Sequence, residues 1–223
     1  MAGHVHPRQL AFVLPHEESR SRDDFLEGPA NAAALALIDA WPDWPGRAMM
    51  LVGPEGSGKS HLAAIWSELA GARSTAARAL SPVSVPAALA TGALVMEDLR
   101  SGDFDERALF HLLNLAREDA AFVLITARLP ASALQVELRD LGSRLRALPI
   151  VSLLPPDDQL LRALIVKLSA DRQLSIDEAV VGYVASRIER SYAAARQAID
   201  LLDREALRLG RPITRALAAE LLR

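Results

Sequence analysis

The sequence predicts an α/β protein in which a parallel sheet with flanking helices is followed by a small all-α domain. Three observations lead to this fold class. A glycine-rich phosphate-binding motif, residues 51–60, stands between an apolar strand pattern and a helical pattern. Further short apolar runs, typical of buried parallel strands, recur as far as residue 153. Beyond the pair Pro155 and Pro156 only helical periodicity remains, so this pair marks a domain boundary.

Composition narrows the class of protein. The chain has 223 residues, of which 51% are hydrophobic, enough for one large domain or two small ones. It contains no cysteine, which excludes disulfides and cysteine metal sites and fits a cytosolic protein. The formal charge of −3 provides no general basic field for nucleic acid. No apolar run approaches the roughly 18 residues of a membrane span.

The N-terminal residues 1–22 are polar and interrupted by proline, and we expect them to form a flexible tail. One apolar patch breaks this polarity: in Gln9–Leu14, the residues Leu10, Phe12 and Leu14 alternate with the period of a strand. Two interpretations of the patch remain open. It is either a strand that docks on the protein's own domain, or a linear motif that binds another protein in extended form.

The first regular elements lead up to the phosphate-binding motif. Asn31 is a residue type that caps helices well, and the apolar stretch after it predicts a helix over residues 32–41. Pro42 and Pro45 end that helix. The apolar run 48–52 then predicts a buried parallel strand directly ahead of the motif.

The motif itself fits G-x-x-x-x-G-K-[ST] over Gly53–Ser60 without a mismatch, and a helix is predicted over residues 60–69. Its glycines let backbone N–H groups wrap a phosphate chain, and the start of the helix adds its positive dipole end. Lys59 would reach the β- and γ-phosphates and Ser60 would hold Mg²⁺. The alternative is a glycine-rich turn with an incidental Lys-Ser pair, which the flanking elements disfavour.

A second strand is expected within residues 71–79, and two prolines keep the stretch 81–91 short. The next apolar strand, residues 93–98, ends in Glu97 and Asp98. After a phosphate loop, two such acids are expected to supply an Mg²⁺-associated carboxylate and a carboxylate that polarises water. The alternative is a solvated acidic turn.

A third buried strand, residues 121–126, ends in the polar Thr126, which could face the γ-phosphate because ligands bind at the carboxyl ends of parallel strands. The helix ahead of this strand is marked by the helical spacing of Leu109, Leu112, Leu113 and Ala116. A helix over residues 137–147 follows it, and residues 149–153 form one more strand. The arginines of that helix are Arg139, Arg144 and Arg146.

The last part of the chain predicts four helices. One has an apolar face from Leu160 to Leu168; the next begins at the capping-box pattern Ser175–Glu178 and runs to Ile188. Ala193–Leu209 forms a third, ended by a glycine, and Thr214 caps the last. The expected organisation is a tail (1–22), an α/β nucleotide-binding domain (23–154) and a helical lid (155–223).

This order of motifs resembles the AAA+ domain of the bacterial replication initiator DnaA, and most of all the Hda-type regulators related to DnaA. The segment from Phe25 and Leu26 to Asn31 is similar to the one that frames adenine in DnaA. Asp140–Leu145 is similar to an element whose arginine, here Arg144, acts as a finger on a neighbouring subunit. Gln9–Leu14 resembles the peptide by which Hda binds the β sliding clamp. The chain ends where DnaA continues into a DNA-binding domain, so we expect no direct sequence-specific DNA binding.

The resemblance implies a nucleotide site for ATP or ADP with Mg²⁺. Its metal residues are Ser60 and Glu97, and its candidate catalytic residues are Glu97, Asp98, Thr126 and Arg144. Its nucleotide-binding residues are Phe25, Leu26, Gly53, Pro54, Glu55, Gly56, Ser57, Gly58, Lys59, Ser60, His61 and Arg196. The partner-binding residues are Gln9, Leu10, Phe12 and Leu14, for the clamp.

Three positions depart from the family pattern. Glu97 stands where the family usually carries Asp, and Ala127 or Arg128 replaces a polar pair after the sensor threonine. Ala193 occupies the place of the lid arginine that contacts phosphate, and Arg196 lies one helical turn further on as a substitute. We therefore expect nucleotide binding with weak intrinsic hydrolysis.

The function implied is regulation of replication initiation. Tethered to the β clamp in the bacterial cytoplasm, the protein would promote hydrolysis of DnaA-bound ATP through Arg144. Two other classes are kept: an autonomous AAA+ ATPase motor or loader that uses Glu97 and Asp98, and an adaptor that bridges the clamp to a partner without hydrolysis. DnaA and the clamp are thus the expected partners, together with a possible homo-oligomer and no membrane.

Overall fold

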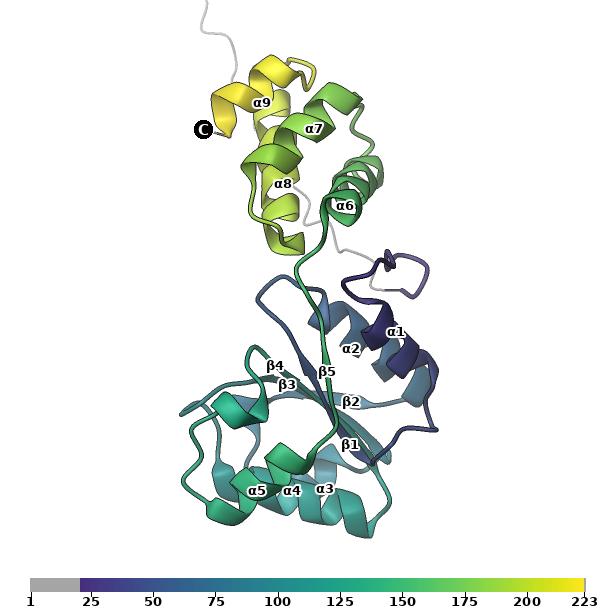
Figure 1. Ribbon diagram of the computed structural model, residues 1–223, viewed down its shortest axis with the longest axis vertical. Coiled ribbons are helices and arrows are strands. Elements are labelled where there is room, and N and C mark those ends of the chain that lie inside the picture. Colours follow the sequence, from purple (N-terminus) through teal and green to yellow (C-terminus); the bar gives the residue numbers. More distant parts are fainter. Residues whose placement is uncertain (1–20, 223) are drawn as a thin grey trace, which may run out of the picture.

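The computed structural model describes residues 21–222, and its centre is a five-stranded parallel sheet (Figure 1). The strand order is β2-β3-β4-β1-β5. The strands are β1 (Ala48–Val52), β2 (Arg73–Ala76), β3 (Ala93–Leu99), β4 (Phe122–Ala127) and β5 (Ile150–Ser152). The predicted patch Gln9–Leu14 lies outside the described residues, so its two interpretations both stand.

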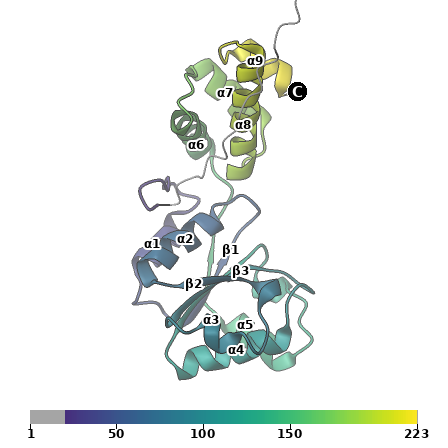
Figure 2. The same ribbon diagram turned by 180° about the vertical axis from the view of Figure 1, so that it is seen from behind.

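Helices cover both faces of the sheet, because alternate residues of each buried strand point to opposite sides. On β1, Met49 and Leu51 pack in the cluster with α1 and α2, while Met50 and Val52 pack in the cluster with α3, α4 and α5. Figures 1 and 2 show these two groups on either side of the sheet. The helices are α1 (Ala32–Asp39), α2 (Lys59–Ala70), α3 (Val85–Ala88), α4 (Glu106–Glu118) and α5 (Arg139–Ala147).

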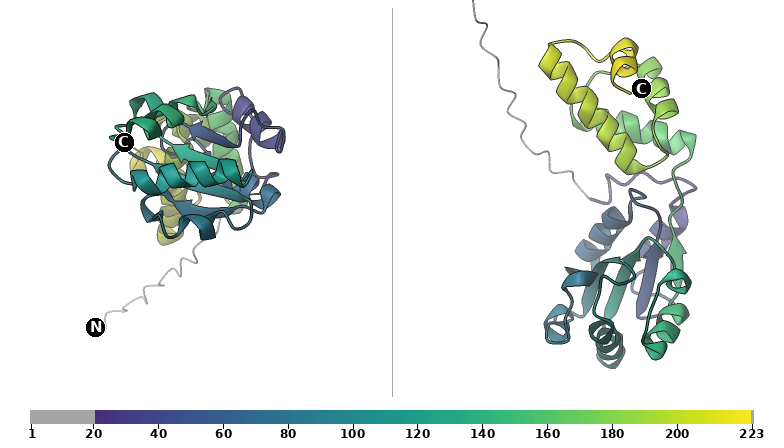
Figure 3. Two further views of the ribbon diagram at one scale, coloured as in Figure 1. Left: turned by 90° about the horizontal axis from the view of Figure 1, so that it is seen from below. Right: turned by 90° about the vertical axis from the view of Figure 1, so that its left-hand side faces the viewer.

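The chain then leaves β5 and enters an all-helical lid, which lies beyond the sheet along the long axis of the molecule (Figures 1 and 3). Its core is built from apolar residues at helical spacing, such as Leu161, Ile165 and Leu168. The lid helices are α6 (Asp158–Asp171), α7 (Glu178–Arg187), α8 (Tyr192–Leu209) and α9 (Arg215–Leu221). The predicted fold class, a parallel sheet with flanking helices followed by an all-α domain, is confirmed. Within residues 21–222, no helix has the length and hydropathy to cross a membrane.

Of two predicted helix caps, one is confirmed in position only and the other is wrong. Asn31 precedes α1 but makes no side-chain cap; its amide instead accepts from Gly28 N and donates to Leu26 O, both at 2.9 Å. The side chain therefore holds the preceding turn rather than the helix. In the lid, the N-cap of α7 is Asp177, which accepts from Val180 N at 2.8 Å, and not Ser175.

The sheet brings the carboxyl ends of its central strands together. Val52 at the end of β1 is in register with Ala127 at the end of β4. The pairing of β3 with β4 shifts between Met96 and Leu99, so the acidic pair between them sits in an irregular stretch. In a parallel sheet this edge is where a ligand is expected, and the glycine-rich loop begins there.

Candidate functional site

The loop Gly53–Ser60 has the backbone of a phosphate cradle. Gly56 and Gly58 adopt φ values of +69° and +96°, which side chains other than glycine rarely tolerate. At Gly53, an added Cβ would lie 2.7 Å from Ser57 Oγ and 2.8 Å from Leu153 O. The helix α2 begins at Lys59, so its N-terminal end faces the loop. The loop therefore needs its glycines for conformation and for close approach.

Lys59 is held inside this loop. Its Nζ donates to the backbone oxygens of Gly53 at 2.8 Å and Pro54 at 2.6 Å. Burial, followed by the positive charge of Arg128, lowers the pKa of the Lys59 ammonium. A cation that is partly desolvated and bound by neutral oxygens gains strongly from an anionic partner. The loop thus fits the phosphates of a nucleotide.

Ser60 and Glu97 could hold a divalent cation. They line one cavity, together with Ser74, whose hydroxyl donates to Glu97 Oε1 at 2.8 Å. A hydroxyl and a carboxylate are ligands that suit Mg²⁺. Within the part of the chain that the structure describes, no group of three or more His, Asp or Glu residues could bind a metal on its own. Phosphate and water oxygens would have to complete the coordination.

The half-exposed carboxylate of Asp98 is held by arginines. It has a φ of +61°, and its carboxylate forms an ion pair with Arg100, whose Nε lies 2.8 Å away. That hydrogen bond lowers the pKa of Asp98. Its backbone N–H donates to Thr126 Oγ1 at 2.9 Å, and Thr126 is only 2% exposed. Thr126 thus fixes the bend of β3; its predicted contact with a γ-phosphate stays a prediction.

Arg128, noted in the sequence only as a departure from a pattern, proves to be part of the site. Its Nη1 pairs with Glu55 Oε2 of the phosphate loop at 2.5 Å, and its Nε lies 3.9 Å from Asp98 Oδ1. The guanidinium therefore bridges the phosphate loop and the end of β3. No sequence signal gave the partner of Arg128, since Glu55 and Asp98 are distant from it in the chain.

An apolar pocket for a planar group adjoins the loop. Phe25, which is 9% exposed, packs its ring edge-on against His61, with 5.2 Å between ring centroids. The lid contributes Leu160, Leu164 and Tyr192 to the same pocket, which pattern analysis did not identify. The pocket lies where the two domains meet, a common position for ligand sites. The sheet-domain side and the linker contribute Asp24, Phe25, Leu26, Ala30, Asn31, Gly56, Ser57, Gly58, His61, Leu154 and Pro156.

The lid contacts the phosphate loop through the first turn of α8. Tyr192 N donates to Gly56 O at 2.8 Å, and a Cβ on Gly56 would come within 2.6 Å of Ala193 Cβ. The position expected of the lid's phosphate-binding arginine thus lies against the loop, but holds alanine. Arg196 lines the cleft beside Lys59 and Ser60. Arg196 therefore lies where an arginine that replaced the expected lid arginine at the phosphates would have to lie.

Asp200 lines the same cleft as Arg196 and lies 3.9 Å from its Nε. On the other side, the side chain of Arg172, which is 8% exposed, holds Asp200 Oδ1 at 2.5 Å. Asp200 is thus fixed between two guanidinium groups and orients the one that faces the cleft.

Arg144 lies on α5, apart from the residues above. The helix packs on the sheet face opposite to α2 (Figure 1). Its guanidinium carbon lies 4.8 Å from the ring centroid of Phe110 on α4. The sequence also allows a bland interpretation of Arg144, as a surface arginine paired with Asp140 at helical i, i+4 spacing. That pairing is wrong for the described structure, because the partner of Arg144 is this ring. The structure therefore gathers the other candidate residues at one edge and leaves Arg144 on a different surface.

Comparison with known proteins supports the fold but not a family membership. No protein-family model and no curated protein sequence matches the chain. Among solved structures, domain III of the replication initiation protein DnaA from Thermotoga maritima matches with a TM-score of 0.76 and 19% identity, over 94% of this chain and 98% of that one. The Holliday junction branch migration motor RuvB from the same organism matches with a TM-score of 0.73 and 19% identity, over 91% of this chain and 71% of that one.

A third structure, the replication initiator DnaA bound to AMPPCP and single-stranded DNA, matches with a TM-score of 0.64 and 17% identity, over 84% of this chain and 67% of that one. Identities this low show the fold alone. The protein therefore has the AAA+ fold, with a five-stranded parallel sheet followed by a helical lid, as in DnaA and RuvB.

Proposed function

We propose that this protein is a nucleotide-binding regulator of replication initiation that acts on DnaA. Held at the β sliding clamp through Gln9–Leu14, in the bacterial cytoplasm near the nucleoid, it promotes hydrolysis of DnaA-bound ATP. Arg144 is the trans-acting finger. Its own nucleotide, ATP or ADP with Mg²⁺, is structural and sets the angle between sheet domain and lid.

The nucleotide site rests on Lys59. A partly desolvated ammonium bound by backbone carbonyls, at the start of a helix that follows two glycines of positive φ, is a site for an anion. The pocket of Phe25 and Leu26 beside it would receive the base. When bound, the nucleotide places negative charge beside the ammonium of Lys59 and the guanidinium of Arg196, which line the same cleft.

The observation that carries the action on a partner is the position of Arg144. It lies on the face of the sheet that does not carry α2, so it does not serve its own phosphate loop. Its contact with Phe110 orients the guanidinium without neutralising it, since an aromatic ring carries no net charge. A charged, oriented arginine on an outer helix is suited to contact a phosphoryl group of a neighbouring molecule.

An autonomous ATPase motor or loader is the second candidate. It is favoured by the cavity that Ser60 shares with Glu97 and by the likeness to RuvB. Two observations weigh against it: Asp98 is bound to Arg100, and Ala193 occupies the place of a lid arginine. Turnover of ATP by the purified protein alone separates the two candidates, because a regulator of this kind hydrolyses its own nucleotide slowly.

The decisive experiment measures hydrolysis of DnaA-bound ATP with this protein, clamp and DNA present. Arg144→Ala should lower the stimulation by on the order of 10³-fold, or to background, while nucleotide binding and fold persist. Arg144→Lys should fail nearly as far, because an ammonium lacks the planar fork that spans two phosphate oxygens. Arg139→Ala and Arg146→Ala are the controls on the same helix. Full stimulation by Arg144→Ala would favour the adaptor.

The same assay tests the tether. Replacing Gln9, Leu10, Phe12 and Leu14 with Ala should abolish clamp binding, since these side chains would supply the polar anchor and the apolar contacts. Stimulation of DnaA should then be lost even though Arg144 is intact. If the variant with all four residues replaced still binds the clamp, Gln9–Leu14 is not the tether. The proposed role of Arg144 would not be affected.

A further inference from the structure

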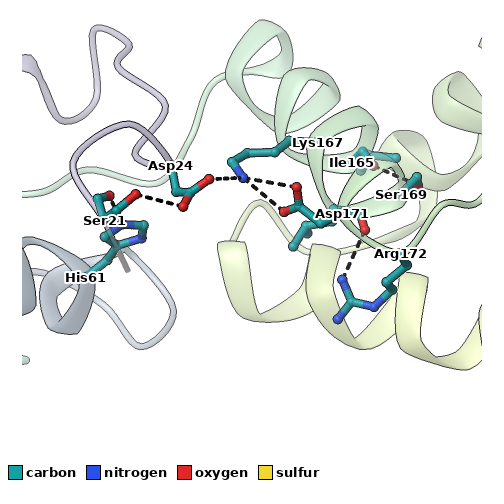
Figure 4. Close-up of polar contacts among 9 residues, drawn as sticks. Ser21, Asp24, His61, Ile165, Lys167, Ser169, Asp171 and Arg172 are labelled. Carbon is teal, nitrogen blue, oxygen red and sulfur yellow. Dashed lines mark hydrogen bonds and ion pairs between the residues drawn. The ribbon is translucent and has the colours of Figure 1, made fainter. Parts of the chain in front are cut away.

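A short segment without helix or strand, residues 21–26, forms one wall of the apolar pocket. We call it the strap. It ends in Phe25 and Leu26, both of which line the pocket, and it lies between the first turn of α2 and the lid helix α6 (Figure 4). Because it has no ladder of backbone hydrogen bonds of its own, its position depends on side-chain contacts from its neighbours.

The first anchor of the strap is on the sheet domain. The His61 ring, two residues after Lys59, lies with Nε2 2.9 Å from Ser21 O, and the Phe25 ring packs edge-on against the same imidazole. The strap is thereby joined to the helix that begins at the phosphate loop.

The second anchor is on the lid. Lys167 Nζ lies 2.8 Å from Asp24 Oδ1 and 2.9 Å from Asp171 Oδ2, while Ser21 Oγ donates to Asp24 Oδ2 at 2.8 Å (Figure 4). Burial opposes the charged form of Lys167, but its hydrogen bonds with the two carboxylates outweigh this and raise its pKa. The ammonium therefore stays charged and bound at physiological pH.

The same face of α6 carries the apolar part of the contact. Leu160, Leu164 and Lys167 follow one another at helical spacing, and the two leucines pack against Ala30 and Leu26. Side-chain exposures of 22% for Lys167 and 29% for Asp24 distinguish this pair from Arg162–Glu178, which joins α6 to α7, with 47% and 79%. Partial burial strengthens an ion pair, whereas exposed pairs contribute little.

We propose that Lys167 is a positioning residue for the nucleotide base: through Asp24 it holds the strap, and with it Phe25 and Leu26, against the lid. The lid thus completes the wall of the base pocket that the contacts with His61 begin, so base binding and lid closure are coupled. This rests on the proposed nucleotide site and is independent of any action on DnaA. The phosphates are bound by the loop itself, which Lys167 does not contact.

The test compares two probes, ADP and inorganic triphosphate, on the full chain by calorimetry. Lys167→Met should weaken ADP binding roughly tenfold, as expected for loss of a partly buried charge-assisted pair, and leave triphosphate binding unchanged. Arg162→Met, which removes the exposed pair within the lid, is the matched control and should change neither. Equal losses for both probes would mean a general structural role and would overturn the proposal, as would unchanged ADP affinity.

A double-mutant cycle tests the pair itself. Asp24→Asn should weaken ADP binding about as much as Lys167→Met, and the double variant should be no weaker than either, because both remove the Lys167–Asp24 pair and the pair with Asp171 lies away from the strap. Additive losses would overturn the assignment of Asp24 as the partner through which Lys167 acts. If the unaltered protein bound neither ADP nor triphosphate, the proposed nucleotide site itself would be wrong. The same would follow if Lys59→Ala bound both probes as tightly as the unaltered protein.

Discussion

Lys59 shows how much a single residue of a motif determines. Its ammonium is bound by the oxygens of Gly53 and Pro54, so the loop that positions the charge is also the loop that would bind phosphate. Burial lowers its pKa, which means that the charged form is costly until an anion arrives. A bound phosphate therefore stabilises Lys59 as much as Lys59 stabilises the phosphate.

We accordingly expect Lys59→Ala to weaken both ATP and ADP by about 2–3 kcal/mol, the value of a charged hydrogen bond. Calorimetric titration of each nucleotide measures this. Arg139→Ala, on a helix away from the loop, should leave the affinity as it is. Equal affinity in Lys59→Ala would show that the nucleotide, if bound, is bound elsewhere.

Single residues also show which features of the site can be predicted from the sequence and which cannot. Roles for Lys59, Ser60, Glu97 and Thr126 could be proposed from the sequence because their chemistry depends on their place in a motif, and these roles stay predictions. The partners of Asp98 could not, since its carboxylate is held by Arg100 and lies near Arg128 only after β3 and β4 pair. Side-chain partners across a fold depend on register and on the shift between Met96 and Leu99, which no local pattern specifies.

At the scale of elements, the partly exposed strands β2 and β5 were marked less clearly, whereas β1, β3 and β4 were predictable because each contains a short apolar run that is largely buried. Helix starts were less so, since several residues can cap one end. Asn31 occupies the N-cap position of α1, but its side chain bonds two backbone groups of the preceding turn instead of an N–H group of the helix. Asp177 displaces Ser175 because a carboxylate adjacent to the first helical residue bonds Val180 N directly.

Asn31 therefore has a larger role than a cap. We expect Asn31→Ala to lower the free energy of unfolding by about 1–3 kcal/mol, because Gly28 N and Leu26 O each lose a partner. Asn31 is only 8% exposed, so water would not readily replace it. The substitution should also weaken ADP binding, since Leu26 lines the base pocket. Asp177→Ala is the matched control: loss of its cap should cost about 1 kcal/mol and leave ADP affinity unchanged. Denaturant unfolding measures the loss of stability in the two variants, and nucleotide titration measures their ADP affinity. If Asn31→Ala and Asp177→Ala lowered the ADP affinity equally, Asn31 would have no special role at the base pocket.

For the whole molecule, the relation of lid to sheet domain is the property that matters. The sequence indicates an all-helical lid, but not that the first turn of α8 would lie directly on the phosphate loop. That contact depends on a glycine in one domain and a small residue in the other: Ala193 can approach Gly56 because neither carries a bulky side chain. Alanine at position 193 thus permits close docking of the lid on the loop.

This contact leads to a prediction that separates lid docking from backbone strain. Gly56 and Gly71 both have positive φ values, +69° and +61°, so alanine at either is strained by about 1–2 kcal/mol. At Gly71, however, the new Cβ meets nothing within 4 Å, whereas at Gly56 it would lie 2.6 Å from Ala193 Cβ and 2.8 Å from Ala193 N. Gly56→Ala should therefore push the lid off the loop, and Gly71→Ala should not.

The readouts are best taken without nucleotide, so that any direct effect of Gly56→Ala on phosphate binding does not enter. Hydrogen exchange at Tyr192 N–H should rise in Gly56→Ala, because its bond to Gly56 O at 2.8 Å is lost, and the radius of gyration from small-angle scattering should increase. Gly71→Ala should lose a similar amount of stability while both readouts stay at the values of the unaltered protein. If the two variants exchanged Tyr192 N–H at the same rate and scattered alike, close packing of Ala193 on Gly56 would not be what docks the lid.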